Sequence, residues 1–142
     1  MPDIPARRRQ TDGQSKLAWQ TAPVPADLKP DGTYEFRLPV AMGFRSNPPG
    51  KFSLRLNGKP ALDFDVVLHD QTWQSADGKV QMRYTIMEDN SEDSNGILAL
   101  RVAASLLEPG QPATFEVVGS AANSQRWFGV YLLAMADQRA AR

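Results

Sequence analysis

The segment from Glu88 to Gly96 reads EDNSEDSNG and places carboxylates, amides and hydroxyls together between two apolar runs. Calcium binds about six to eight oxygens, and such side chains and backbone carbonyls are its usual ligands. The spacing does not match an EF-hand loop, because the carboxylates do not alternate ahead of a glycine and no late glutamate follows. A calcium site, a ligand-contacting loop and a solvated connection all stay open. The candidate calcium ligands are Glu88, Asp89, Glu92 and Asp93.

Residue types that perform catalysis are sparse. His69 is the single histidine, and the chain contains no Gly-x-Ser-x-Gly elbow, no Ser-x-x-Lys motif and no His-x-x-x-His zinc spacing. Carboxylate pairs for glycoside hydrolysis can be drawn from several acids, but no spacing singles out one pair. We therefore expect no catalytic residues and a protein that is not an enzyme. A small hydrolase built around His69 is kept as an alternative.

Aromatic residues near the C-terminus suggest a binding surface. Trp127 and Phe128 are neighbours, so in a strand they point to opposite faces. Phe128 has the parity of an apolar, core-facing set, and Trp127 then shares the outer face with Gly129 and Tyr131. Sugar C–H faces pack on such rings, whereas the alternative is that the rings face a second sheet or a neighbouring domain. The candidate ligand-binding residues are Trp127, Tyr131, Trp73, Gln125 and Arg126.

The elements that must position these residues show a period of two. Apolar and polar residues alternate in seven short runs, which is typical of half-buried antiparallel strands. The inward-facing runs span Tyr34–Val40, Phe52–Leu56, Leu62–Leu68, Val80–Ile86, Leu98–Val102, Phe115–Val117 and Phe128–Leu132. Short turn signals such as Asn57-Gly58 and Asp77-Gly78 separate them. The pattern predicts an all-β fold, an antiparallel β-sandwich or jelly roll of seven strands, or eight if Leu17 and Trp19 begin another.

The ends of the chain lack this alternation. Residues 1–16 are polar and aperiodic, which predicts a flexible N-terminal arm. Residues 17–134 are predicted to form the β-sandwich domain, and residues 135–142 a C-terminal tail. The division predicts one domain, as the length of 142 residues also does.

One hairpin can be interpreted residue by residue. Directly opposed residues of an antiparallel pair share a face. A three-residue loop, 57–59, keeps Asp63 off the core side, whereas a two-residue loop would place it there. The favoured register pairs Phe52 with Phe64 and Leu54 with Leu62. We therefore expect Asp63 and Asp65 to lie on a solvated face, where each forms an ion pair with a basic residue, and we do not expect them to act as a catalytic pair.

Composition limits the partners. Sixteen basic residues balance sixteen acidic ones, so no excess charge favours nucleic acid or an anionic membrane. Disulfides and thiolate metal sites are excluded because the chain has no cysteine. The first residues lack the apolar segment of a secretory signal, and the compartment stays unknown. An excised module would be extracellular or periplasmic.

The order of these features is similar to a known family. The hairpin FSLRLNGKPALDFDV, the turn and strand LLEPGQPATFEVVGSA and the closing SQRWFGVYLL resemble galactose-binding-like jelly-roll modules of carbohydrate-active enzymes. The likeness covers about Tyr34 to Leu133. It implies a non-catalytic accessory module that recognises an oligo- or polysaccharide beside a catalytic domain, in some cases with a structural calcium. The alternative is a structural or protein-interaction domain that packs on a partner.

Overall fold

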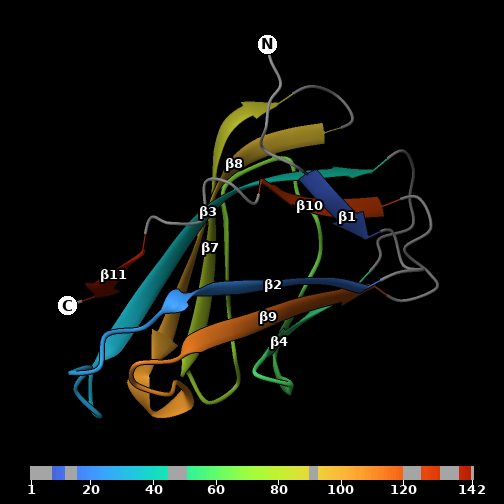
Figure 1. The fold of residues 1–142 in the computed structure, drawn as a ribbon. Helices are drawn as coiled ribbons and strands as arrows, with labels where there is room; N and C mark the ends of the chain where they lie inside the picture. Colours follow the sequence, from blue (N-terminus) through green and yellow to red (C-terminus); the bar gives the residue numbers. More distant parts are fainter. Residues whose placement is uncertain are drawn as a thin grey trace.

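The chain folds into two antiparallel β-sheets packed face to face (Figure 1), which confirms the predicted all-β sandwich. The computed structural model describes residues 8–11, 16–44, 51–89, 93–119, 126–131 and 138–141. The four-stranded sheet has the order β2 (Lys16–Pro23), β9 (Pro112–Gly119), β4 (Phe52–Leu56), β5 (Lys59–Phe64). The seven-stranded sheet has the order β1 (Arg8–Thr11), β10 (Arg126–Tyr131), β3 (Thr33–Phe44), β8 (Asp93–Ala103), β7 (Val80–Asp89), β6 (Gln71–Gln74), and β11 (Gln138–Ala141) also pairs with β3.

Aromatic side chains join the inner faces of the two sheets. Phe36 on β3 meets Phe115 on β9 edge to face at 5.2 Å, and Phe64 on β5 meets Phe128 on β10 at 5.5 Å. Each buried ring contributes about 1.5–3 kcal/mol by leaving water. The predicted inward positions are confirmed wherever the structure describes their side chains, except that Leu68 and Ile86 are only half-buried.

The hairpin between β4 and β5 confirms the predicted register and corrects the predicted loop. Phe52 lies opposite Phe64 and Leu54 opposite Leu62, as expected. The prediction of a three-residue loop is wrong, because Asn57 and Gly58 form a two-residue turn with φ of 51° and 83°. The register shifts after Leu54 instead, so a bulge within the ladder absorbs the odd residue. Asp63 is on the solvated face as expected, with Lys51 Nζ 3.9 Å from its Oδ2.

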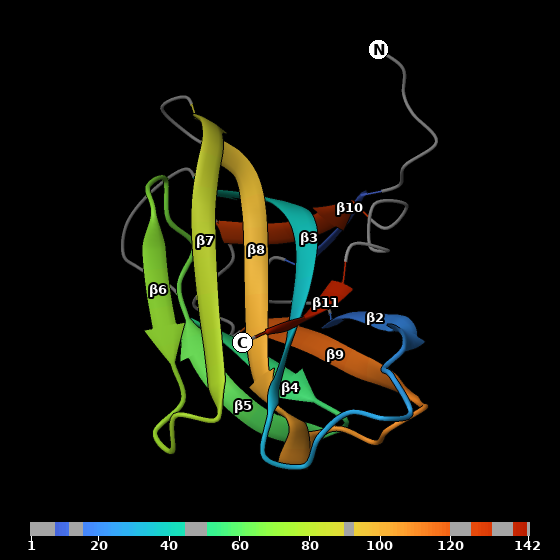
Figure 2. The same cartoon turned by 90° about the vertical axis from the view of Figure 1, so that its left-hand side faces the viewer.

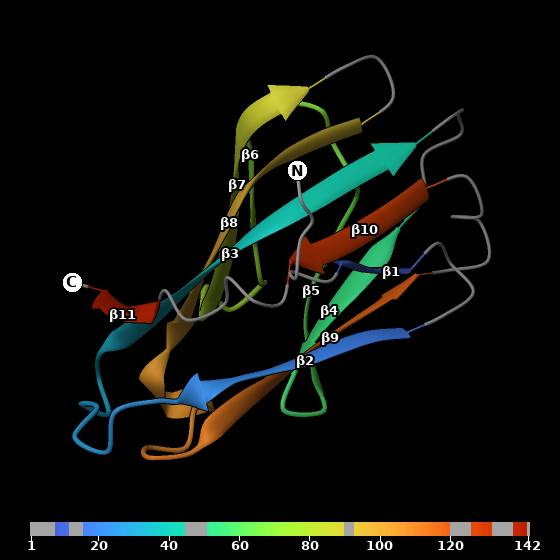
Figure 3. The same cartoon turned by 45° about the horizontal axis from the view of Figure 1, so that its top comes forward.

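Strand β3 is the longest strand and carries two different partners along one edge. Strand β10 pairs with its residues 40–44 and β11 with residues 33–36, as Figure 3 shows at the two ends of β3. Among the described residues, no strand pairs with positions 37–39 on that edge. Pro39 lies in this interval, where a missing N–H interrupts no ladder.

Three short strands lie where the sequence showed no apolar alternation. Strand β1 falls in the stretch predicted as an arm, β11 in the predicted tail, and β6 in a polar segment between two of the predicted runs. β1 and β6 end the strand order of their sheet, and β11 adds a pairing beside β3. Within the described residues there is also no helix with the length and hydrophobicity that crossing a membrane requires.

Candidate ligand-binding face

The outward side chains of β3, β8 and β7 form one continuous surface. These three strands run side by side in Figure 2, with the four-stranded sheet behind them. Their register aligns the outward residues in rows across the sheet. From one end, the rows are Gln81, Arg101 and Glu35, then Arg83, Ala99 and Arg37, then Thr85, Ile97 and Pro39.

The outward residues surround a hollow of about 500 Å³. We call this surface the arginine face, and it is lined by Glu35, Arg37, Gln81, Arg83, Thr85, Ile97, Ala99 and Arg101. Ala99 and Ile97 form a small apolar floor on the middle strand. Longer polar side chains rise from the strands on either side. Among the described residues, the hollow therefore combines apolar side chains on the middle strand with hydrogen-bonding groups on the strands beside it.

The charges of this face are unevenly paired. Arg37 Nε donates to Glu35 Oε2, and this carboxylate is mostly buried, with 14% of its side chain exposed. Arg83 is exposed, and no hydrogen bond or ion pair engages it within the described part of the chain. A guanidinium carries five N–H donors in a planar fork that suits carboxylates and hydroxyls.

Trp127 and Tyr131 lie on the same outer face, further along the sheet. Phe128 and Val130 are fully buried in the core, so the alternating residues of β10 face outward as the sequence predicted. Trp127 is opposite Gly43, and its indole lies against that glycine. Trp127 and Tyr131 are both half-buried. Gln125 and the side chain of Arg126 lie outside the described residues, so their predicted role stays a prediction.

Trp73 is placed apart from these two rings. It lies on the inner side of β6, opposite Met82, and meets Phe64 edge to face at 5.7 Å. β6 and β10 are separated by three strands of the sheet. Trp73 is therefore half-buried against the core, and its predicted contact with a ligand stays a prediction.

The acidic hairpin between β7 and β8 does not gather its carboxylates in the described residues. Asn95 Nδ2 donates to Glu88 Oε1 at 3.4 Å, whereas Asp89 lies opposite Ser94 and Asp93 opposite Gly43. No group of three histidine, aspartate or glutamate side chains suited to a metal occurs in the part of the chain that the structure describes. Glu92 lies outside that part. The calcium site therefore stays a prediction.

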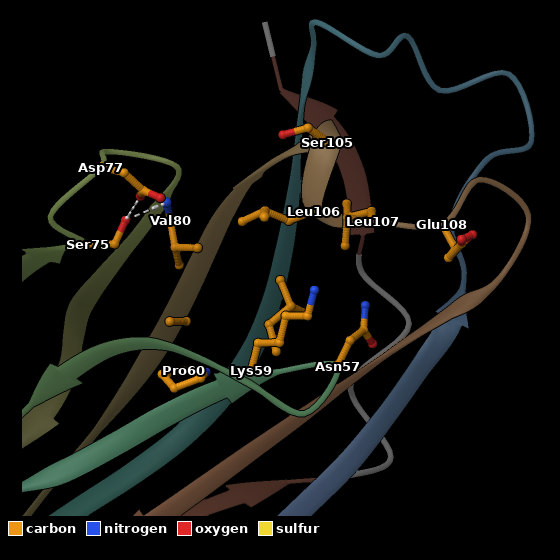
Figure 4. Close-up of a pocket in the computed structure, with 12 residues that line it drawn as sticks. Asn57, Lys59, Pro60, Ser75, Asp77, Val80, Ser105, Leu106, Leu107 and Glu108 are labelled. Carbon is orange, nitrogen blue, oxygen red and sulfur yellow. Dashed lines mark hydrogen bonds between the residues drawn. The ribbon is translucent and has the colours of Figure 1, made fainter.

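A second cavity, of about 410 Å³, opens at the end of the sandwich (Figure 4). The hairpin that carries Asn57 and Lys59 forms one side, and the 3₁₀ turn η1 (Ala104–Leu106) with Leu107 forms the other. Asp77 on its rim is held in a turn, where its Oδ1 accepts hydrogen bonds from Lys79 N and Ser75 Oγ. These hydrogen bonds lower the pKa of the Asp77 carboxyl. The carboxylate therefore stabilises the turn in which it lies.

His69, the residue of the hydrolase alternative, is exposed on a loop. Its Nδ1 lies 2.9 Å from the backbone oxygen of Asp70. Within the described ranges, this contact is to a backbone oxygen and not to a serine or a carboxylate side chain. This environment gives no support to a triad.

No local pattern in the sequence identifies the arginines as a site. Each of Arg37, Arg83 and Arg101 appeared only as the polar member of an alternating run. The signal that could have found them is the shared outward parity of three strands. That signal is useful only when the three strands are known to be adjacent.

The comparisons with known proteins add little. No family model matches the chain, and no curated protein matches it. Among solved structures, it is similar to the sugar-binding C-terminal domain of EclA, with a TM-score of 0.40 and 15% identity over 92% of this chain and 78% of that one. The match to the CspB protease of Clostridium perfringens has a TM-score of 0.37 and 5% sequence identity, and it covers 82% of this chain and 24% of the protease chain. The match to the catalytic domain of a GH87 alpha-1,3-glucanase in complex with nigerose has a TM-score of 0.30 and 15% sequence identity. It covers 90% of this chain and 27% of the glucanase chain. These TM-scores are too low to carry an argument about function.

Proposed function

We propose that the protein is a non-catalytic carbohydrate-binding module that holds a saccharide on the arginine face. The observation that carries this proposal is the hollow of about 500 Å³ on the outer side of the seven-stranded sheet. Its floor is apolar and small, made by Ala99 and Ile97, and its rim is polar, with Arg37, Arg83 and Gln81. Binding sites for small ligands span about 300 to 1,000 Å³ and combine these two features.

A sugar ring suits such a hollow for two reasons. Its C–H faces are apolar and can rest on the alanine and isoleucine side chains. Its hydroxyls both donate and accept, so the guanidiniums of the rim, the amide of Gln81 and the hydroxyl of Thr85 can all engage them. Because the hollow is open, water stays in the site, and we expect a weak affinity, roughly micromolar to millimolar.

The aromatic end of the same face lengthens the proposed site. Gly43, which supports the indole of Trp127, lies four residues along β3 from Pro39 in the last row of the hollow. At strand rise this is on the order of 13 Å, a distance that an oligosaccharide of a few units covers. Trp127 and Tyr131 would then contact sugar units beyond the hollow, together with the predicted contributors Gln125 and Arg126.

Affinity electrophoresis through gels that contain polysaccharides, together with a glycan array, tests the proposal. The wild-type protein should be retarded by at least one saccharide. Ala99→Glu, which fills the floor of the hollow, should abolish this retardation. Gln20→Glu is the matched control, because it adds the same charge at an exposed position on the outer side of the four-stranded sheet. If no saccharide retards the wild type, or Ala99→Glu behaves as the control does, the proposal is wrong.

The alternative of a structural or protein-interaction domain is separated by light scattering. A partner-packing domain should associate into a stable complex or dimer that shields Trp127 from a fluorescence quencher. A saccharide-binding module should stay monomeric with Trp127 accessible until the saccharide is added.

A further inference from the structure

The arginine face concentrates positive charge on a molecule whose formal net charge is zero. Lysine plus arginine equals aspartate plus glutamate over the whole chain. Among the described residues that line the hollow, however, there are three arginines and one glutamate, which is a formal balance of +2. Charge of one sign in a concave site attracts a ligand of the opposite sign.

The strand register brings two of these arginines to the same place. Arg83 on β7 and Arg37 on β3 both lie opposite Ala99 on the strand between them. Neighbouring strands are about 4.8 Å apart, so the two arginine α-carbons are separated by roughly 10 Å. Ala99, whose side chain is a single methyl group, lines the hollow together with both arginines.

Glu35 makes the two arginines unequal. It accepts a hydrogen bond from Arg37 Nε, which fixes the orientation of that guanidinium and offsets part of its charge. Arg83 has no such partner among the described residues. The strongest attraction for an anion is therefore on the β7 side of the hollow, and Arg101 in the adjacent row adds a third positive charge.

We propose that the arginine face selects acidic saccharides and seats one carboxylate or sulfate group above Ala99, between Arg83 and Arg37. This inference rests on the proposed saccharide-binding function and names its ligand class. The planar guanidinium of Arg83 binds the anionic group in a forked, charge-assisted manner, and Arg37 contacts it from the other side. The amide of Gln81 and the hydroxyl of Thr85 receive the neutral hydroxyls of the same sugar unit.

A saccharide fits this face better than a nucleic acid does. Proteins that bind single strands combine a long basic groove with aromatic platforms for successive bases. None of the described residues that line the hollow is aromatic, and the chain has no net positive charge. One anionic group per sugar unit on a short hollow matches the charges that are present.

Binding to polygalacturonate, its fully methyl-esterified form, a sulfated galactan and a neutral galactan tests the inference by affinity electrophoresis and titration calorimetry. The esterified form has the same backbone without the carboxylate, and the sulfated galactan separates a sulfate from a carboxylate. We expect binding to at least one acidic polymer to exceed binding to its neutral counterpart by about tenfold or more, since hydrogen bonds to charged groups are strong. We also expect the acidic preference to weaken as salt is added.

Arg83→Gln is the decisive variant, because it keeps a polar side chain and removes the charge. It should remove the acidic preference, because binding to the acidic polymer falls by far more than binding to the neutral polymer does. Arg37→Gln should have the same direction of effect. The control is Arg55→Gln, an exposed arginine on the outer side of the four-stranded sheet, which should behave as the wild type does.

The outcomes separate the inference from the function on which it rests. Equal binding of acidic and neutral polymers, or an acidic preference that survives in Arg83→Gln, overturns the inference and leaves saccharide binding in place. Retention of an oligonucleotide as strong as that of the acidic polymers also overturns it. Retention of no polymer overturns the proposed function itself.

Discussion

The indole of Trp127 lies against Gly43, the residue directly opposite it across the pair of β10 and β3. A Cβ atom on residue 43 would be 2.5 Å from Cε2 of the indole and 2.7 Å from Cζ2, which is closer than real contacts allow. Glycine at this position is therefore what lets the indole approach the backbone of β3.

Gly43→Ala should displace the indole, because the added methyl group and the ring cannot occupy the same space. The indole N–H resonance of Trp127 in a ¹H–¹⁵N NMR spectrum should move by far more than those of the other two tryptophans. Trp127→Phe assigns the resonance by removing it. An unchanged resonance in Gly43→Ala would contradict the described packing.

Trp127→Ala should weaken the binding of long oligosaccharides and spare short ones. The ring is on the order of 13 Å from the last row of the hollow, so a ligand of one or two sugar units does not reach it. Titration calorimetry with a length series of the saccharide that the protein retains measures the effect. Tyr131→Ala should show the same dependence on length. A loss that is equal for all lengths would place the indole inside the primary site instead.

Ser94→Ala should lower the free energy of unfolding by about 1–3 kcal/mol, because it removes the partner of a buried hydroxyl. Tyr84 is fully buried, its hydroxyl lies 2.8 Å from Ser94 Oγ, and Ser94 Oγ donates to the backbone oxygen of Val67 at 3.0 Å. Urea unfolding measures the change. In a Tyr84→Phe background the same substitution should cost less, since no tyrosine hydroxyl is then left unpaired. Equal costs in both backgrounds would show that the two groups are not coupled.

Asp77 should titrate below its ordinary pKa of 3.8, because Lys79 N and Ser75 Oγ donate hydrogen bonds to its carboxylate. A lowered pKa in the folded protein stabilises the fold above pH 3.8, and this contribution is lost as the pH falls through the folded value. The melting temperature of the wild type should therefore exceed that of Asp77→Asn at neutral pH, and the difference should shrink in acid. NMR titration of the carboxyl carbon gives the midpoint directly. In Ser75→Ala that midpoint should rise toward the ordinary value, and a midpoint that does not move would contradict the assigned cause.

Calcium at the acidic hairpin is tested by melting the protein in calcium and in chelator. A bound ion stabilises the folded state by mass action, so the calcium prediction requires a higher melting temperature in calcium. The double variant Asp89→Ala with Asp93→Ala should lose this difference, and magnesium should not replace calcium. Identical melts of the wild type in calcium and chelator would leave the hairpin as a solvated connection.

The sequence predicts the inner faces of this fold well because their signal is local. Phe52, Leu54, Leu62 and Phe64 alternate with polar residues along a few residues of chain, and their pairing follows from one turn. The loop of that hairpin was predicted one residue too long, because a two-residue turn with a shifted ladder and a three-residue loop keep the same inward residues. Only backbone geometry distinguishes them.

The arginine face was less accessible to prediction from the sequence. Arg37 and Arg83 are 46 positions apart in the sequence. They line the same hollow because their two strands both pair with β8. Such pairing depends on tertiary packing, which leaves no local pattern in the sequence. β1, β6 and β11 were missed for a related reason, since each is short and its position beside a longer strand, rather than its own composition, makes it a strand.

Along β7, buried Val80, Met82 and Tyr84 alternate with outward Gln81, Arg83 and Thr85. The inward residues of this strand thus serve the stability of the fold, and its outward residues serve the proposed ligand specificity. The two sets can largely be changed independently. A combinatorial library that randomises only the outward-facing residues of β3, β7 and β8 should yield folded variants at high frequency. These variants should have new ligand preferences on an unchanged scaffold.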